Sequence, residues 1–267
     1  MLTSVAFIAA MAFAPGQGGL ALGNTRVTFG ELGAARPDVK FLPGDIFFVA
    51  FDIDGIKVDE TGRVKYSMGM NVVDKEGKEI FIQQPAERED FLPLGGTKLP
   101  ARAFVTIGLD QAPGIYSCKV TVVDLASKAT QTLEQKFEVL KPAFGQVQVL
   151  TSADGKGEIP APPLGVAGQS VFVHFAVVGF TRDPKSKQPD IDVEMAVMNK
   201  DGTPALPKPT NININTNVGE KDSGVPLRFL LPMNRVGDFT VELKATDKLS
   251  KATSRVSIPI KVLAAAN

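Results

Sequence analysis

The sequence contains very little of the chemistry that most catalytic and metal sites require. It has one cysteine, Cys118, and one histidine, His174, in 267 residues. A single cysteine excludes a disulfide within the chain and a metal site built from several thiolates. Most hydrolytic and transition-metal chemistry relies on imidazole or thiolate groups. We therefore expect a protein that is not an enzyme and that carries no cofactor.

A charge of one sign is also missing. Lys plus Arg and Asp plus Glu both total 29, so the formal net charge is zero. Such a balance gives no field that draws the chain to nucleic acid or to an anionic membrane. The apolar run from Val5 to Ala14 is too short to cross a bilayer. We predict no nucleic-acid partner and no membrane span in the mature chain, and the oligomeric state is left open.

The first 23 residues resemble a secretory signal peptide. The run from Val5 to Ala14 has the length of an apolar signal core, and a cut after Ala14 obeys the small-residue rule. A cut after Gly23 is the rival site. The segment lacks the usual Lys or Arg near its start, so an apolar first strand or a misplaced start codon is the alternative interpretation. Taken as a signal, residues 1–23 predict a periplasmic, cell-envelope or secreted protein.

An internal repeat is the most informative feature of the sequence. Four blocks occur twice, in the same order and at nearly constant spacing, which indicates duplication of a whole domain. We predict two domains, residues 24–141 and 142–267, with the boundary at Lys141-Pro142. The matched blocks are Pro43 to Phe51 with Ala167 to Phe175, Val72 to Gly77 with Val197 to Gly202, Gly114 to Asp124 with Gly237 to Asp247, and Ser127 to Thr130 with Ser250 to Thr253.

Apolar residues alternate with polar ones inside these blocks. Such period-two patterns, with turn residues between them and no helical periodicity, predict antiparallel sheets with one buried face. A further strand is expected at Phe104 to Leu109, matched by Leu227 to Leu231. The predicted inner sets are Phe47, Val49, Phe51, Ile53 with Val171, Val173, Phe175, Val177, and Tyr116, Cys118, Val120, Val122 with Phe239, Val241, Leu243, Ala245.

The stretch Gly114-Ile115-Tyr116-Ser117-Cys118 resembles the start of strand F in immunoglobulin-like domains. The chain departs from antibody domains because it has no second cysteine and no tryptophan, and because Phe239 replaces the tyrosine in the second copy. The resemblance is therefore to the broad immunoglobulin-like or fibronectin type III-like architecture, over roughly residues 24 to 264. It implies an all-β chain of two tandem antiparallel β-sandwiches, and a fold of this kind does not supply a function.

One acidic cluster is a candidate cation site. Asp52, Asp54 and Asp59 lie in and after the first strong strand, and calcium prefers carboxylate and carbonyl oxygens. The second copy has Ala176 and Gly179 in the matching region. A solvated, turn-forming acidic loop is the alternative.

Two aromatic residues, Phe48 and Phe172, take the outward phase of matching strands. They predict either an interaction patch or packing beneath a loop or linker. His174 has the same outward phase and is expected to be an ordinary surface residue, whereas Cys118 is expected to be a buried, unreactive thiol. The run Asn211 to Asn217 is expected to form a polar edge strand or a long loop.

These observations favour an exported, non-catalytic structural or adhesive interaction protein of the cell envelope, with a protein or a cell-surface polymer as partner. The alternative is a periplasmic two-domain chaperone or assembly factor that binds its partner by strand addition. That mechanism requires a bare apolar edge and a basic anchor, neither of which can be located in the sequence. Sugar binding is disfavoured because the chain has no Trp and only two Tyr, both in inner phase.

Overall fold

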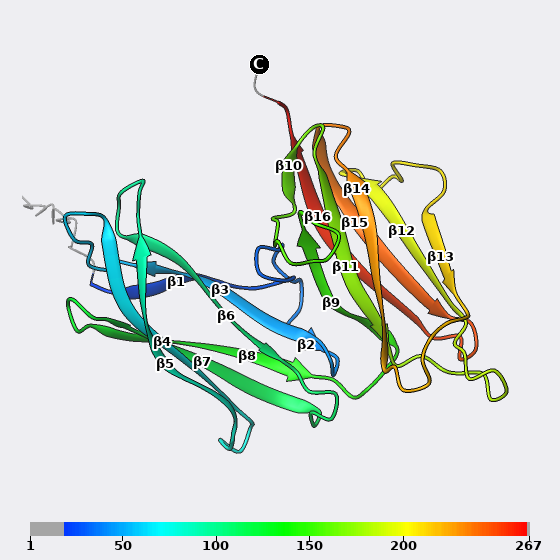
Figure 1. Cartoon of the computed structure of the whole chain (residues 1–267), viewed down its shortest axis with the longest axis horizontal. Coiled ribbons are helices and arrows are strands. Elements are labelled where there is room, and N and C mark those ends of the chain that lie inside the picture. Colours follow the sequence, from blue (N-terminus) through cyan, green and yellow to red (C-terminus); the bar gives the residue numbers. More distant parts are fainter. Residues whose placement is uncertain (1–18, 266–267) are drawn as a thin grey trace, which may run out of the picture.

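The computed structural model of the chain describes residues 19–265, which form two antiparallel β-sandwiches in tandem (Figure 1). Of the signal-like segment, residues 1–18 lie outside the described part. Leu20 is buried in the first core, and β1 begins at Ala21. Residues 19–23 of the predicted segment are therefore part of the described structure, and Leu20 packs in the first core.

The first sandwich packs a three-stranded sheet against a five-stranded sheet. The strand orders are β1-β3-β6 and β2-β8-β7-β4-β5. All pairs are antiparallel except β2 with β8, which is parallel. The strands are β1 (Ala21–Thr28), β2 (Lys40–Phe41), β3 (Ile46–Asp54), β4 (Arg63–Val73), β5 (Glu79–Phe91), β6 (Lys98–Thr106), β7 (Gly114–Asp124) and β8 (Thr130–Val139).

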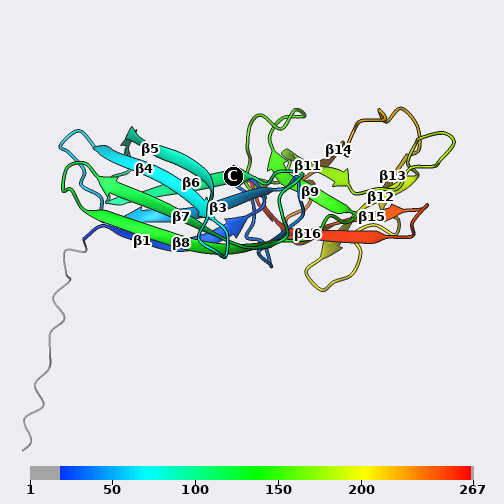
Figure 2. The ribbon, with the colours of Figure 1, turned by 90° about the horizontal axis from the view of Figure 1, so that it is seen from below.

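The second sandwich repeats this arrangement strand for strand. Its sheets have the orders β9-β11-β14 and β10-β16-β15-β12-β13, and β10 pairs parallel with β16. The strands are β9 (Gly145–Ser152), β10 (Leu164–Val166), β11 (Ser170–Val178), β12 (Ile191–Asn199), β13 (Thr210–Ile214), β14 (Gly224–Pro232), β15 (Gly237–Asp247) and β16 (Thr253–Leu263). Figure 2 shows the two sandwiches lying side by side along the long axis.

The period-two alternation correctly predicted the inner faces. The inward side chains of β3 and β7 are at most 5% exposed, and those of β11 at most 3%. Phe239 at the start of β15 is the exception, because it is only half-buried.

One predicted strand was displaced. Residues Phe104 to Leu109 were expected to be extended, but β6 ends at Thr106 and Leu109 lies in the following turn, 57% exposed.

Tyr116 contributes a contact that is typical of immunoglobulin-like strand F. Its hydroxyl donates to the carbonyl of Ala112 at 2.7 Å and accepts from the side chain of Gln111 at 2.6 Å. A tyrosine that bonds to backbone a few residues upstream also occurs in immunoglobulin domains, where it is called the tyrosine corner. Phe239 takes the same place in the second copy and has no hydroxyl.

Backbone hydrogen bonds show which residues of the two copies are equivalent. The amide of Gly44 donates to Ile107, and the amide of Ile107 donates to Asp45. In the second copy Gly168, Met233 and Gln169 make the same two bonds. Gly44-Asp45 and Gly168-Gln169 are therefore the same corner of the fold.

Within residues 19–265, no helix has the length and apolar character needed to cross a membrane.

Candidate functional site

The two sandwiches meet at a polar joint built around a buried carboxylate. Asp45 is 2% exposed, and its Oδ2 lies 3.0 Å from Nη1 of Arg36. Its Oδ1 accepts the backbone N–H of Gln148 in β9 at 2.7 Å. The side chain of Gln148 donates in turn to the carbonyl of Gly44 at 2.9 Å. Two hydrogen bonds thus cross between the sandwiches, and the cation of Arg36 balances the buried charge.

A bulge in β9 makes this joint possible. The pairing of β9 with β11 changes register around Gln148, whose φ is 54°. A bulged residue leaves the ladder, so its N–H is free to bond elsewhere. In β1 the matching bulge holds Asn24 with φ 51°, and its side chain bonds instead to Asp52 of its own sandwich at 3.2 Å.

An apolar anchor accompanies the polar bonds. Phe29, directly after β1, is 5% exposed and belongs to the core of the second sandwich, although its strand belongs to the first. The loop that carries it is visible in blue against the second sandwich in Figure 1. Gly30, with φ 73°, lies so close that a Cβ there would be 2.6 Å from the Cβ of Leu150. Burying a phenylalanine side chain stabilises by about 2 to 3 kcal/mol.

Arg36 connects the polar and apolar parts of the joint. Its guanidinium lies 4.2 Å from the ring centroid of Phe41 and 4.9 Å from that of Phe29. Nη2 donates to the carbonyl of Lys40 at 3.2 Å. The arginine therefore fixes the β1–β2 loop against both cores through stacking as well as charge. No sequence pattern points to this joint, because neither Phe29 nor Arg36 lies in a repeated block.

The predicted surface aromatics have different surroundings in the two copies. Phe48 stacks on Phe104 of β6, with ring centroids 5.2 Å apart, and Phe104 is 56% exposed. Two residues earlier on the same face of β6, Arg102 Nε lies 2.7 Å from Glu31 Oε1. The outer face of the first three-stranded sheet therefore presents an aromatic pair and an ion pair.

The matching face of the second sandwich lies under a loop. Arg228 Nη1 donates to the carbonyl of Gly155 at 2.7 Å, and Nε2 of His174 lies 2.8 Å from Oγ of Ser152. A Cβ on Gly155 would lie 3.5 Å from the ring of Phe172, which is ordinary contact distance. Phe172 and His174 thus pack beneath the loop that follows β9.

The three acidic residues of the predicted calcium loop do not converge. Asp52 and Asp54 both approach the ammonium of Lys98, at 3.3 and 3.0 Å. Asp59 lies in a separate turn, where its Oδ1 accepts from Thr61 and Arg63. Among residues 19–265, no three His, Cys, Asp or Glu side chains are grouped so that they could hold a metal ion.

Cys118 lies inside the first core with no exposed surface. Burial raises the pKa of its thiol to about 12. A thiol that stays protonated at neutral pH is a poor nucleophile and a poor metal ligand.

The repeated tail after β7 and β15 turns out to be a buried aspartate turn. Asp124 and Asp247 are both fully buried. The carboxylate of Asp124 accepts from Ser127 Oγ at 2.6 Å and from the backbone N–H of Lys57 at 3.1 Å. Asp247 accepts in the same way from Ser250 and Thr181. These bonds tie the turn to the loop after the second strand of each three-stranded sheet.

The same bonds control the ionisation of these carboxylates. Burial acts to raise the pKa of Asp124 and Asp247, but the hydrogen bonds from Ser127 and Ser250 and from backbone N–H groups outweigh it. The pKa of each carboxyl group therefore lies below its ordinary value. Both groups stay charged and serve as structural acceptors.

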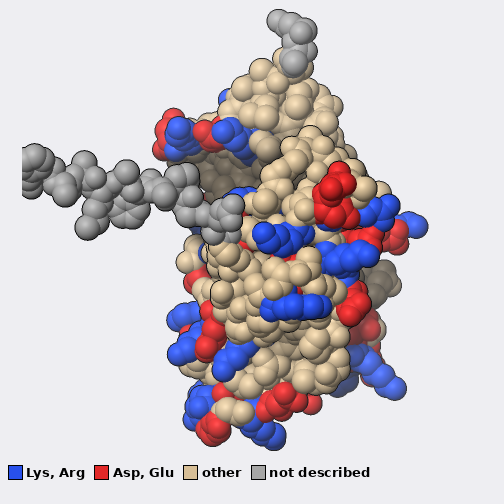
Figure 3. Space-filling view, turned by 90° about the vertical axis from the view of Figure 1, so that its left-hand side faces the viewer, with Lys and Arg blue, Asp and Glu red and all other residues tan. Residues whose placement is uncertain are grey.

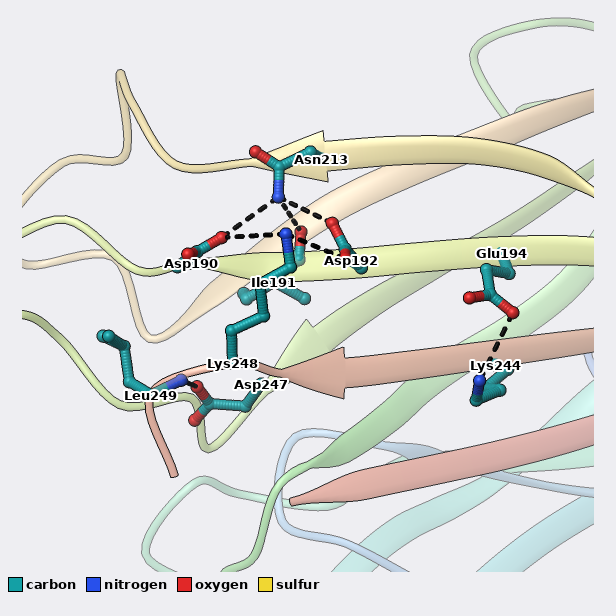
Figure 4. Close-up of polar contacts among 9 residues, drawn as sticks. All are labelled: Asp190, Ile191, Asp192, Glu194, Asn213, Lys244, Asp247, Lys248 and Leu249. Carbon is teal, nitrogen blue, oxygen red and sulfur yellow. Dashed lines mark hydrogen bonds and ion pairs between the residues drawn. The ribbon is translucent and has the colours of Figure 1, made fainter. Parts of the chain in front are cut away.

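A polar network covers the edge of the second five-stranded sheet (Figure 4). Nζ of Lys248 lies 2.8 Å from Asp192 and 3.5 Å from Asp190, and Nδ2 of Asn213 donates to Asp192 at 2.7 Å. The hydrogen bond that Lys248 donates to Asp192 raises the pKa of Lys248. Asn213 comes from β13, so part of the asparagine run does form the predicted edge strand.

Acidic and basic side chains are mixed over the end of the molecule in Figure 3. This face has no extended area of one sign, in agreement with the balanced composition. One exposed ion pair of the first sandwich joins Lys65 to Glu89 at 3.5 Å. Exposed pairs of this kind contribute little to stability.

Comparisons with known proteins give no close relative. No family model matches the chain, and no curated protein matches it. Among solved structures, the C-terminal domain of the AgI/II polypeptide BspA of Streptococcus agalactiae covers 90% of this chain and 100% of its own, with 11% identity and a TM-score of 0.31. A second structure of that domain covers 89% and 99%, with 11% identity and a TM-score of 0.29. Likenesses this weak support no inference about function.

Proposed function

We propose that the chain is an exported, non-catalytic interaction protein of the cell envelope, in which two immunoglobulin-like sandwiches act as one rigid spacer. The observation that carries the proposal is the joint. Phe29 is buried in the neighbouring core, and Asp45 and Gln148 are bonded across the boundary. An enzyme would need converging reactive groups, whereas a spacer needs a fixed angle between its domains.

The stacked pair of half-buried Phe48 and exposed Phe104 is the contact surface that we assign to the partner. Aromatic side chains are enriched at the centres of protein interfaces. The flanking ion pair of Arg102 and Glu31 supplies the polar rim. A protein or a cell-surface polymer is the partner class, and the periplasm, cell envelope or extracellular space is the location that the signal-like segment implies.

Rigidity is tested with one spin label in each sandwich. The label of the first sandwich is attached at Leu109→Cys or at Glu60→Cys, and that of the second at Lys208→Cys. Cys118→Ala removes the native thiol. We expect a single narrow distance distribution. Phe29→Ala combined with Asp45→Asn should broaden it. A broad distribution in the protein without these two changes would disprove the rigid spacer.

The contact surface is tested by co-sedimentation with envelope fragments. We expect Phe48→Ser with Phe104→Ser to reduce the bound fraction at least about fivefold. Leu109→Ser, which changes an equally exposed residue elsewhere, is the matched control. Equal binding by the aromatic and control variants would refute the assignment.

One observation favours strand addition as a second candidate function. β5 is the last strand of its sheet, and Ile80, Phe81 and Ile82 on it are 38 to 47% exposed. An apolar edge of this kind can accept a further strand. Proline opposes such pairing: Pro85 limits the usable part of β5 to the residues before it, and the edge strand β14 of the second sandwich carries Pro226 and Pro232. Ile82→Lys should abolish capture of an extended apolar peptide if β5 is used in this way.

A further inference from the structure

The second sandwich contains an apolar cavity that the first one lacks. It has a volume of approximately 460 Å³ and opens between the two sheets beside β12 and β14. The space at the equivalent place in the first sandwich is approximately 110 Å³. Protein cores contain few voids larger than a water molecule, whereas ligand pockets span about 300 to 1,000 Å³. The larger space therefore has the size of a ligand site.

Two differences in sequence open the cavity. In the first sandwich the rings of Tyr116, Phe137 and Phe47 stack between the sheets, with centroids 4.5 to 5.6 Å apart. Phe239, Ile260 and Val171 occupy these places in the second copy. Ile260 lines the cavity at the place where Phe137 lines the smaller space, so an aliphatic side chain stands there instead of a ring.

The edge strand is the second difference. β5 has 13 residues, and its Ile80 and Phe81 line the small space of the first sandwich. β13 has only 5 residues, and its first residue, Thr210, already lies at the edge of the cavity. The segment 203–205 pairs there instead, with Ala205 N–H bonded to Val197 and Asn199 N–H bonded to Thr203, both at 2.7 Å. The backbone of β12 is therefore already paired beside the cavity, and a further β-strand cannot pair with it there. An occupant of the cavity would instead place an alkyl chain between the sheets.

The rim of the cavity is basic. Its lining includes Lys208 and Arg235 and no acidic side chain. The guanidinium of Arg235 lies 4.9 Å from the ring centroid of Phe239 and donates to the side chain of Asn199, a neutral acceptor. An arginine has five N–H donors, so several remain for a ligand. The inner wall is apolar and is formed by Met195, Val197, Leu231, Met233, Phe239 and Ile260.

We infer that this cavity binds a free aliphatic carboxylate of the fatty-acid class. The alkyl chain would lie between the sheets, and the carboxylate would bond to Arg235 and Lys208 at the rim. Charge complementarity and an apolar interior together select an anion with one hydrocarbon tail over a sugar, a nucleotide or a metal. This inference goes beyond the proposed spacer function and does not depend on it.

The test uses decanoate and protein labelled with ¹³C on the methionine methyl groups. Met195 and Met233 line the cavity, whereas Met68 and Met70 lie in the core of the first sandwich. We expect saturable shifts of the first two signals and none of the other two. Decanol, which has the same tail without the charge, should bind about tenfold more weakly.

Variants identify the site. Ile260→Phe restores the ring found at Phe137 in the first copy, and it should abolish the methionine shifts. Arg235→Gln should weaken decanoate binding about tenfold. Arg255→Gln, which changes an exposed arginine paired with Glu242 on β15, should leave binding unchanged. Because Arg235 is exposed, its variant is informative even if Ile260→Phe fails to fold.

Three outcomes would overturn the inference. They are no shift of Met195 and Met233, equal shifts of all four methionines as with a detergent, and unchanged binding in a folded Ile260→Phe variant. Vesicles of anionic phospholipid form a separate arm. If they shift Met195 and Met233 while decanoate does not, a membrane surface and not a free fatty acid is the ligand.

Discussion

The loop after the first strand serves different purposes in the two sandwiches. In the first, the loop from Phe29 to Val39 places Phe29 in the neighbouring core and Arg36 on Asp45. In the second, the loop after β9 folds back over its own sheet and covers Phe172 and His174. Duplicated strands preserved the two cores, whereas the loops between them diverged into a joint and a cover.

The cores themselves also diverged in one place. Aromatic stacking around Phe137 closes the first sandwich, whereas Ile260 leaves the second one open. A long β5 and a short β13 reinforce the difference. A duplicated domain can thus keep its fold while one copy opens a cavity that is mostly filled in the other.

Disrupting the joint should cause the greatest loss of stability. Phe29→Ala should destabilise the second sandwich by about 3 kcal/mol, because it leaves a cavity in that core. Guanidinium denaturation followed by circular dichroism gives the size of the loss, and hydrogen exchange shows which sandwich opens. Phe104→Ala, at an exposed ring, is the control and should cost less than about 1 kcal/mol. Greater exchange in the first sandwich alone would contradict the assignment of Phe29.

Removing the charge of the buried aspartate should destabilise the two copies equally. Asp124→Asn and Asp247→Asn each remove charged acceptors from buried N–H and O–H donors, so each should cost about 2 kcal/mol. Denaturation curves of the two variants measure this. An effect confined to one copy would show that the turns are not equivalent.

The same turns predict a pH dependence. The pKa of Asp124 and of Asp247 is lower in the folded chain than its ordinary value. Each carboxylate therefore stabilises the fold fully above about pH 4, and this contribution is lost as the pH falls through the folded pKa. The stability difference between the unmodified chain and the double Asn variant should shrink below about pH 4. A constant difference down to pH 2 would oppose this account.

Tyr116→Phe makes the first copy resemble the second. The hydroxyl bond to Ala112 is lost, and Gln111 loses its acceptor. We expect a loss of about 1 kcal/mol from the first sandwich, measured by denaturant midpoint. No change would mean that the corner contributes nothing beyond the buried ring.

Calcium should have the smallest effect. Lys98 already occupies the space between Asp52 and Asp54, and Asp59 lies elsewhere. Millimolar calcium should shift the melting temperature by less than about 1 °C. A larger rise of the melting temperature that disappears in Asp54→Asn would support the predicted calcium loop.

The all-β architecture, the duplication and most of the core follow from the amino-acid sequence alone. Strict alternation fixes which side chains of β3, β7 and β11 face inward, since successive residues of a strand point to opposite faces. Even the aspartate turn was visible as a repeated Ser-Lys-Ala-Thr tail, although its buried carboxylate was not. Local pattern was sufficient wherever structure depends on near neighbours along a strand.

No local pattern indicates how the two copies meet or where space remains between the sheets. Phe29 belongs to the same core cluster as Val149 across the boundary, and the cavity depends on residues from five strands and two loops. Such contacts join residues that are far apart in sequence, and no periodicity records them. Packing between distant segments, and not the pattern within one strand, made the joint and opened the cavity.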